Sequence, residues 1–496
     1  MENSLKERYE QLVTERNQYL YRARESAKLT IPSIMPEEGA SGQTGFDTPW
    51  QSVGSRGTNN LASKILLAMF PPNSPFFRLT LDEAERAEMS DSSKGEVDEG
   101  LTMYERVVTS DIENSKFRSS MYQAARHLIV CGNALLFDAD EGMRMYPLDR
   151  YVVKRDASGE VWEMIAVDVT LWKALDDDVK ATLAGNGERK DSDEVTIYTG
   201  IMREGKKYKI WQEIDETKVP KSEGEYPLDA TPWIPLRPVA LDGESYGRGF
   251  VEELFGDLNT LDTLTQAVTE GAGIASLVKF LVDPNGVTDK KDLVETPNGG
   301  FCTGRDQDIN VLRVDKGGDL NVAHQAIQVI SERLAFAFLL NSAARRDAER
   351  VTAEEIRFIA QELEDAFGGI YSVLSQELQL PLVRWRIKKL VKSQKLPPLP
   401  KEVNTEIITG LEALGRGHEH QRLRAFVGDA AQVIGPEALV EYLEVSEYMK
   451  RSAAALNIDT QGLVRQQDEV DQRRQAQQEA AAAAQAQAAQ PQQPQQ

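Results

Sequence analysis

Residues 341–357, NSAARRDAERVTAEEIR, contain the local signal that decides how this chain is organised. Thr352 is a natural N-cap, because its hydroxyl can accept a hydrogen bond from the first turn of a helix. Glu355 stands three residues later and can return that bond, which completes a capping box, and Val351 and Ile356 occupy the positions of a hydrophobic staple. The sequence therefore predicts a helix that starts at Thr352 and follows a short charged loop.

The predicted helix continues well beyond its cap, because apolar residues recur at spacings near three and four. They are Ile356, Ile359, Ala360, Leu363, Phe367, Ile370, Leu374 and Leu378. Gly368 and Gly369 interrupt this stripe, and paired small residues are a recognised cause of a kink. Pro381 breaks or bends the helix again, and a proline-rich linker follows at 396–400. Residues 353–395 are thus predicted to form one long kinked helix.

Two further helical runs lie before the charged loop and enclose an insertion. The first is predicted to run from 249 to about 282 and the second to cover 323–340. The apolar stripe of the first run consists of Leu254, Leu258, Leu261, Leu264 and Val268. A strong turn signal, Asp283-Pro284-Asn285-Gly286, opens the insertion, and short β-like runs such as 310–314 lie within it. We expect a compact insertion at 283–322 between the two helical runs.

The first 248 residues mix helical and strand patterns. A helix is predicted from Leu5 to Ala27, a glycine-rich loop from Gly39 to Gly57, and a short helix from Asn59 to Phe70. Two β-hairpins follow: Tyr151–Arg155 with Val161–Val167 around residues 156–159, and Val195–Arg203 with Lys206–Ile214 around Glu204-Gly205. Further helices are predicted after Pro400, and a Gln- and Ala-rich tail without core-forming residues from about 466. The whole indicates an α+β protein that is mainly helical.

The charge balance excludes some classes of nucleic-acid-binding protein. The chain has 496 residues, with 57 Lys and Arg against 79 Asp and Glu, and a net charge of −22. Proteins that grip nucleic acid over their whole surface are usually basic, because neutralising phosphates supplies much of the affinity. The composition argues against a repressor or a packaging histone. It is compatible with a conduit through which DNA slides.

No segment reads as a membrane span or an export signal, because the longest apolar runs are too short and the N-terminus lacks the signal pattern. Cys131 and Cys302 are expected to be thiols of a protein that folds in a reducing cytoplasm.

No catalytic constellation can be assembled from the sequence. There is no Gly-x-x-x-x-Gly-Lys-Ser/Thr phosphate loop, no Gly-x-Ser-x-Gly elbow and no His-Glu-x-x-His motif. His418 and His420 are two residues apart and do not share a helix face. The acidic run Asp176–Asp178 is interpreted as a solvated helix face. We expect no metal, no cofactor and no enzymatic activity, with a hydrolase of unrecognised site as the remote alternative.

Several segments resemble the portal proteins, or head-to-tail connectors, of short-tailed bacteriophages. They include residues 29–36 (LTIPSIMP), 132–136 (GNALL), 146–151 (YPLDRY) and the stretch from 341 through 382, and the likeness covers most of the chain from 1 to about 450. The resemblance implies a dodecameric ring at the capsid vertex, in the virion, through which double-stranded viral DNA is packaged and ejected. It implies assembly in the host cytoplasm and contacts with the terminase, tail adaptor or tube proteins, the major capsid protein and the scaffolding protein.

The resemblance also gives names to the predicted segments. They are the wing (1–248), stem helix 1 (249–282), the clip (283–322), stem helix 2 (323–340), the channel (tunnel) loop (341–352), the long kinked wing helix (353–395), the crown (396–465) and the tail (466–496). Another oligomeric virion protein, such as a tail adaptor, is the alternative function.

Arg345, Arg346 and Arg350 are the candidate DNA-contacting residues, because they lie in the segment that the resemblance assigns to the channel. A few cations per subunit, repeated around a ring, would touch the phosphate backbone without reading its sequence. The alternative is a solvated connector whose arginines pair with Asp347, Glu349 or Glu354, since exposed pairs of this kind contribute only ~0–1 kcal/mol.

Overall fold

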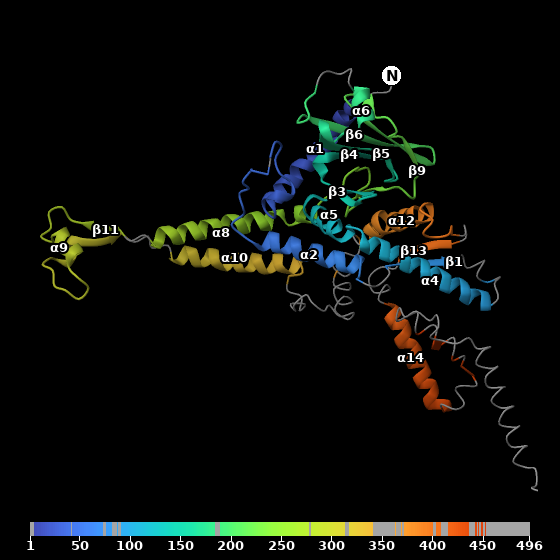
Figure 1. Ribbon diagram of the computed structural model, residues 1–496. Helices are drawn as coiled ribbons and strands as arrows, with labels where there is room; N and C mark the ends of the chain where they lie inside the picture. Colours follow the sequence, from blue (N-terminus) through green and yellow to red (C-terminus); the bar gives the residue numbers. More distant parts are fainter. Residues whose placement is uncertain are drawn as a thin grey trace, which may run out of the picture. The chain divides into compact units, whose positions relative to one another are not determined.

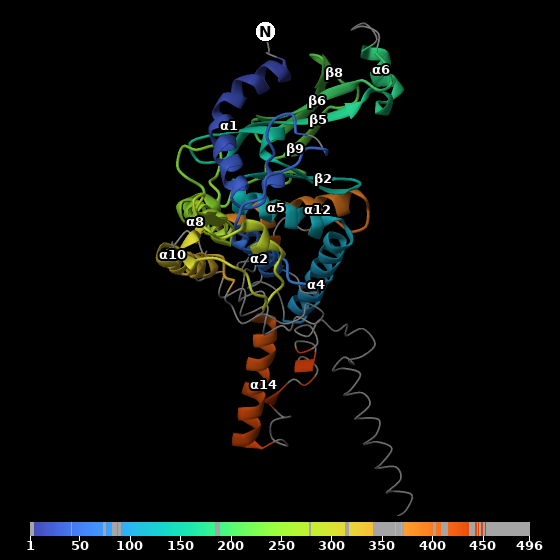
Figure 2. The same ribbon diagram turned by 90° about the vertical axis from the view of Figure 1, so that its left-hand side faces the viewer.

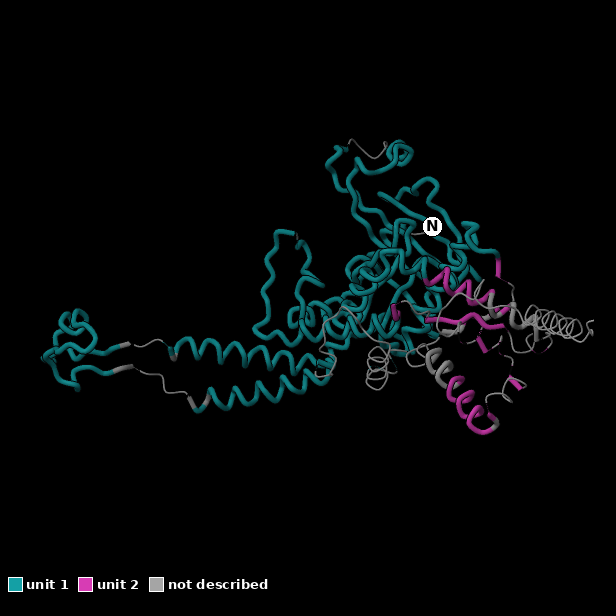
Figure 3. Tube along the Cα trace, turned by 60° about the horizontal axis from the view of Figure 1, so that its bottom comes forward, with its two compact units in different colours: residues 1–69, 110–351, 362–397 teal, residues 70–109, 352–361, 398–496 magenta. Residues whose placement is uncertain are grey.

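The computed structural model (Figure 1) describes residues 4–40, 42–72, 76–81, 87, 91–183, 189–276, 279–312, 317–340, 363, 369, 372–399, 403–407, 415–435 and a few positions between 442 and 452. The chain divides into two units (Figure 3). Unit 1 consists of residues 1–69, 110–351 and 362–397, and unit 2 of residues 70–109, 352–361 and 398–496. Helices and antiparallel sheets both occur, which confirms the predicted α+β class. None of the described helices is long and apolar enough to cross a bilayer.

The largest sheet of unit 1 is antiparallel, in the order β4-β5-β6-β7-β8, with β9 also paired to β7. Its strands are β4 (Tyr151–Arg155), β5 (Val161–Leu171), β6 (Glu194–Glu204), β7 (Lys207–Ile214), β8 (Thr217–Lys218) and β9 (Gly224–Pro227). Both predicted hairpins are confirmed. The second turn is Gly205-Lys206 rather than Glu204-Gly205, because Glu204 pairs with Lys207 and Gly205 supplies the positive φ of 61°.

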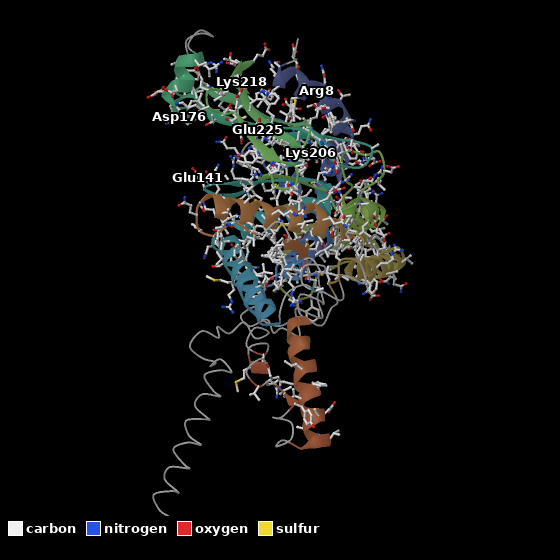
Figure 4. The ribbon with its side chains drawn as sticks, turned by 90° about the vertical axis from the view of Figure 1, so that its right-hand side faces the viewer. Arg8, Glu141, Asp176, Lys206, Lys218 and Glu225 are labelled. Carbon is white, nitrogen blue, oxygen red and sulfur yellow. The ribbon has the colours of Figure 1, made fainter. Side chains whose placement is uncertain are left out.

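Helix α1 (Leu5–Lys28) lies along this sheet, as Figure 2 shows. Its buried Leu5 and Leu12 pack on Val152 and Ile165 of β4 and β5. Gly200 makes room for Leu5, since a Cβ there would lie 2.5 Å from the leucine Cδ2. Arg8 of α1, labelled in Figure 4, donates from Nε to a Glu163 carboxylate oxygen at 3.0 Å. The N-terminal helix predicted from its apolar stripe is therefore confirmed.

A second layer of unit 1 combines helix α5 (Phe117–Cys131) with a three-stranded sheet, ordered β10-β2-β3. Its strands are β2 (Ala134–Ala139), β3 (Gly142–Tyr146) and β10 (Trp233–Leu236). Gly132 ends α5 in the left-handed conformation, with φ of 71°. A Cβ on this residue would lie 2.3 Å from the Arg248 carbonyl carbon, so glycine is required for both reasons. Smaller elements are η1 (Pro32–Ile34), η2 (Leu148–Arg150), η3 (Trp172–Ala174) and α6 (Asp177–Leu183).

Helix α2 (Val53–Met69) begins six residues before the predicted start at Asn59 and takes in part of the expected glycine-rich loop. Gly54 and Gly57 are helical because neighbours approach too closely for a side chain. A Cβ on Gly54 would lie 2.5 Å from the Leu29 carbonyl oxygen, and one on Gly57 would lie 2.3 Å from Phe338 Cγ. These glycines allow close packing of a helix. From the sequence alone they were predicted to belong to a loop.

The predicted helical hairpin is present, with shifted boundaries. It consists of α8 (Phe255–Ser276), preceded by α7 (Phe250–Glu253), and α10 (Gly317–Ala337), which lie side by side in Figure 1. The first helix does not reach residue 282, because β11 (Lys279–Val282) pairs antiparallel with β12 (Ile309–Leu312). The second helix begins at residue 317 instead of 323. Between β11 and β12 lie α9 (Lys290–Glu295) and η5 (Asp306–Asp308).

The last part of unit 1 is a π-helical turn, η6 (Ser375–Gln379), followed directly by α12 (Leu380–Lys392). Pro381 was expected to break or bend the helix because it lacks an N–H group. The helix is not broken there, because the chain widens by one residue just before the proline: the Leu380 N–H donates to the Ser375 carbonyl, five residues back. Helical structure therefore continues through the proline.

Unit 2 contains a two-stranded antiparallel sheet of β1 (Phe77–Leu81) and β13 (Val403–Ile407). Its other elements are α4 (Asp91–Asn114), whose residues up to Thr109 belong to this unit, and α14 (Gly415–Ile434). A helix after Pro400 is present as predicted, in α14, but the strand β13, which was not predicted, precedes it. Residues 70–109 group with this unit and not with the rest of the predicted 1–248 segment. The tail from 466 lies outside the described residues.

Candidate DNA-channel region

Most of the predicted site residues lie outside the part of the chain that the structure describes. This applies to Arg345, Arg346, Arg350, Thr352, Glu355 and Gly368. Gly369 is described: it is helical and exposed, and a Cβ added to it would meet no atom within 4 Å. The loop contacts, the cap and the kink therefore remain predictions. The chain is described up to Leu340, directly before the predicted channel loop, and again at Leu363, Gly369 and from residue 372 onward.

The upstream flank is the end of α10, where the chain leaves the helix. Phe338 is fully buried against Gly57 of α2, and Leu339 has a positive φ of 53°, which is unusual for a branched residue. The Leu340 N–H donates to the Ala335 carbonyl at 2.8 Å, so the helix closes with a wide final turn. This turn ends directly before residue 341.

Two side chains from α2 bind the last carbonyls of this turn. Asn60 Nδ2 donates to the carbonyl oxygens of Phe338 and Leu339, each at 3.1 Å. Lys64 Nζ donates to the Leu339 carbonyl at 3.0 Å, and the lysine is only 5% exposed. A cation suits this place, because the carbonyl end of a helix carries partial negative charge. Neither residue was predicted as part of the site, although a lysine inside the apolar run 61–70 was a detectable signal.

Described residues further along the chain, from Leu363 onward, also contact α2. Leu363 and Leu374 line an apolar cavity of about 30 Å³ together with Leu61, Ile65 and Met69 of that helix. Further along, Gln379 is completely buried in the π-helical turn, and its Nε2 donates to the Met69 carbonyl at 2.6 Å. The segment before residue 341 and the segment after residue 362 therefore contact the same helix.

The hairpin of α8 and α10 carries the chain to this loop. Leu258 and Leu261 of α8 and Ile330 and Leu334 of α10 are buried, and Arg333 donates to Asp257 at 2.7 Å. The opposite faces stay uncovered. Large apolar side chains are exposed along the hairpin at Ile274, Val322, Val329 and Phe336. Helices that are apolar on more than one face are usually buried on more than one face.

The module formed by β11, β12 and the residues between them has a hydrogen-bonded aspartate inside and several apolar side chains exposed on its surface. Asp308 accepts hydrogen bonds from the Thr288 hydroxyl and from the N–H groups of Val287 and Thr288, which lowers the pKa of the carboxyl. Its exposed apolar residues are Phe280, Leu281, Val287, Leu293, Val294 and Phe301. A surface of this kind is typical of a contact with another protein.

Among the described residues, no group of three or more His, Cys, Asp and Glu side chains is placed to hold a metal ion. Asp176 is exposed just before α6, and Asp177 and Asp178 are exposed on its first turn, where Figure 4 labels Asp176. This agrees with the predicted solvated helix face.

Comparison with known proteins gives consistent results. The family model described as bacteriophage head to tail connecting protein matches residues 2–464. The portal protein of Escherichia phage T7 is 42% identical over 484 residues, which cover 95% of this chain and 90% of that protein. The portal protein of Enterobacteria phage T3 is 42% identical over 93% of this chain and 88% of its own length. That of Pseudomonas phage phiKMV is 33% identical over 92% of each chain. The chain, with its helical hairpin and the predicted loop that follows it, belongs to the family of bacteriophage head-to-tail connecting proteins.

Proposed function

We propose that this connector assembles into a ring, with twelve subunits as the expected number, and that viral double-stranded DNA enters and leaves the capsid through its centre. The observation that carries the proposal is the hairpin of α8 and α10, with uncovered apolar faces and a chain exit that leads into the predicted channel loop. Copies of the same chain can cover such faces when each subunit is rotated correctly against the next.

The assigned regions follow the same plan. The hairpin is the stem, the module between β11 and β12 is the clip, residues 341–352 are the channel loop and the segment from 353 to 395 is the wing helix. The exposed apolar residues of the clip suit it to dock the terminase first and tail adaptor or tube proteins later. The ring sits at the capsid vertex of the virion, in contact with major capsid and scaffolding proteins. Its role is structural and involves no cofactor.

The assembly state gives the first prediction. Native mass spectrometry of the purified chain at micromolar concentration is expected to show a closed oligomer of about twelve subunits, because a ring interface leaves no free edge. Negative-stain images should show a central hole. A chain that stays monomeric under all conditions that keep it folded would contradict the ring. An oligomer without a central hole would favour the alternative of another virion protein, such as a tail adaptor.

The second prediction concerns the channel loop. The triple variant Arg345→Gln, Arg346→Gln, Arg350→Gln is expected to assemble normally but to package or retain less DNA, because a collar of cations in an acidic protein binds phosphates weakly and in a salt-sensitive way. The measurement is nuclease-protected DNA per particle. As a matched control, Arg305→Gln removes an exposed cation from the clip. If the triple variant retains as much DNA as the parent, the loop is only a connector.

A further inference from the structure

We propose that the outer face of helix α12 binds the phosphate backbone of packaged double-stranded DNA through Arg384, Lys388, Lys392 and Lys395. The inference rests on the proposed function in one respect, namely that the clip points out of the capsid and that DNA fills the interior. The cations and their neighbours belong to the described structure, and their affinity for DNA can be measured without a particle.

The four cations gather on one side of α12 and on the turn that ends it. Arg384, Lys388 and Lys392 are four residues apart, so they follow one another along one helix face in steps of about 6 Å. Lys395 is exposed directly after the helix. The inward face consists of the buried residues Leu382, Val383, Arg386 and Leu390. The helix is thus fixed from its inner side, and the outer side presents a row of positive charges.

Few carboxylates neutralise this row within the described part of the chain. Arg384 approaches Asp229 only to 3.9 Å, and its side chain is 40% exposed. Among the described residues, none forms an ion pair with Lys388, Lys392 or Lys395. An acidic protein with 79 Asp and Glu residues therefore keeps a local surface on which cations predominate.

The cations lie close enough to affect one another. Desolvation lowers the pKa of Lys388, Asp229 opposes this, and Lys392 and Lys207 lower the pKa further. Helix polarity favours a cation in the last turn, where Lys392 lies, but it does not account for Arg384 and Lys388 in the earlier turns. A polyanion that bound here would relieve the repulsion between these like charges.

Nucleic acid suits this surface better than a protein partner does. None of the described residues of α12 exposes a large apolar side chain, whereas the fully buried core of a protein–protein interface is usually apolar. Ammonium groups can contact phosphates without reading the base sequence. The net charge of −22 does not prevent this contact, because exposed charges more than about 10 Å away are largely screened at 0.1 M salt.

The fold places α12 far from the clip. Helix α8 has 22 residues and is therefore about 33 Å long, and the clip lies beyond its C-terminal end. Helix α12 is fixed beyond the other end of the hairpin, where Arg386 binds Asp138 of β2. Figure 1 shows the clip at one end of unit 1 and α12 toward the other. With the clip outside the capsid, α12 lies on the side of the packaged DNA.

DNA binding by the purified full-length chain tests the surface directly. The triple variant Lys388→Gln, Lys392→Gln, Lys395→Gln is expected to bind a short random-sequence duplex roughly tenfold more weakly at low salt. Each lysine that neutralises one phosphate contributes about 0.9 to the slope of log affinity against log salt, so the slope should become shallower by about 2.7. Fluorescence anisotropy of a labelled duplex over a salt series measures both quantities. Arg384 is left unchanged because it also approaches Asp229.

A matched control removes three cations that are not clustered. The variant Lys6→Gln, Arg56→Gln, Lys173→Gln changes the net charge equally, at exposed positions of α1, α2 and η3. It should keep the affinity and the salt slope of the parent chain, because no row of cations is lost. A parent chain that does not bind the duplex at low salt would overturn the proposal. So would an α12 variant that binds as tightly as the control.

Acetylation of lysines in intact particles tests whether DNA reaches this surface. Lys388, Lys392 and Lys395 are expected to react several times more slowly in DNA-filled particles than in particles that have ejected their DNA. Lys173 should react equally in both, and mass spectrometry of the digested chain measures each rate. Equal protection in both kinds of particle would assign the surface to a protein partner, and equal reactivity without protection would leave it free of DNA. Either result contradicts the proposal.

The channel-loop variant separates this inference from the proposed function. If the triple arginine variant retains all its DNA while the α12 lysines are protected only in filled particles, the α12 surface stands and the assignment of the channel loop is wrong. If rings form and the arginine variant loses DNA while the α12 variant binds the duplex like its control, the proposed function stands and this inference is wrong.

Discussion

Arg386→Met is expected to lower the free energy of unfolding by about 3–5 kcal/mol near neutral pH, because it leaves a buried carboxylate without its cation. Asp138 is completely buried in β2, and Arg386 of α12 donates to it at 2.8 Å. The same guanidinium donates to Asp111 at 2.8 Å, and Trp385 donates its ring N–H to Asp138 at 2.8 Å. The arginine thus joins α12, α4 and the three-stranded sheet.

The loss should depend on pH. Burial raises the pKa of Asp138 above its ordinary value of 3.8, while Arg386 opposes the rise. A carboxyl whose pKa is higher in the folded state contributes its full stability below the ordinary pKa and loses it as pH rises through the folded pKa. Without Arg386 the folded pKa rises further, so this loss grows and extends to higher pH. The deficit of Arg386→Met should therefore be smaller near pH 4 than near pH 7.

Urea denaturation followed by tryptophan fluorescence at both pH values would measure this effect. Arg384→Met is a matched control on the same helix, because Arg384 pairs at 3.9 Å with an exposed Asp229. Exposed pairs contribute about 0–1 kcal/mol. An Arg386→Met deficit as small as that of the control, or one that grows at low pH, would show that Asp138 does not need this cation.

The regular parts of the fold could be predicted because their signals are local. Apolar spacing was enough for α1 and for the two helices α8 and α10, and the turn composition around Ser158 and Gly205 was enough for both β-hairpins. Each of these features depends on residues that lie close together in the sequence. Their type was therefore recoverable, although the turn of the second hairpin lies one residue later than predicted and several ends were misplaced by a few residues.

Features that depend on distant partners were not predicted. Phe280 to Val282 form a strand only because Ile309 to Leu312 pair with them, and Phe77 to Leu81 pair with a strand more than 300 residues later. Gly54 and Gly57 look like loop residues until Leu29 and Phe338 are placed against them. Lys64 has no visible role until the end of α10 is known. Tertiary contacts, rather than local propensity, determine these positions.

Glu377→Gln is the second change with a large expected effect, about 3 kcal/mol of unfolding free energy, because it leaves two buried cations with no anion between them. Arg155 of β4 and Arg237 are each only 6% exposed at the side chain, and both point at this carboxylate. Arg237 Nε donates to it at 3.0 Å, and Arg155 donates twice at 3.4 Å. The lower end of the usual range applies, since Glu377 is 21% exposed and water can partly replace it.

The position of Glu377 links this stability to the π-helical turn and to α12, which follows it. It lies in the π-helical turn that precedes Pro381, and single π-helical turns are rare and frequently found at functional sites. Burial already lowers the pKa of Arg155, and Glu377 is the main group that opposes this. With glutamine at 377 the two guanidinium groups repel each other, and the π-helical turn loses the ion pairs that stabilise it.

Thermal unfolding should show a lower midpoint for Glu377→Gln, together with faster hydrogen exchange of the Leu380 amide. Glu15→Gln is the matched control, because Glu15 pairs at 2.7 Å with half-exposed Lys154, the neighbour of Arg155 on β4. Equal midpoints for the two variants would mean that the arginine pair is satisfied by the carbonyls of Gly159, Pro235 and Glu244 alone.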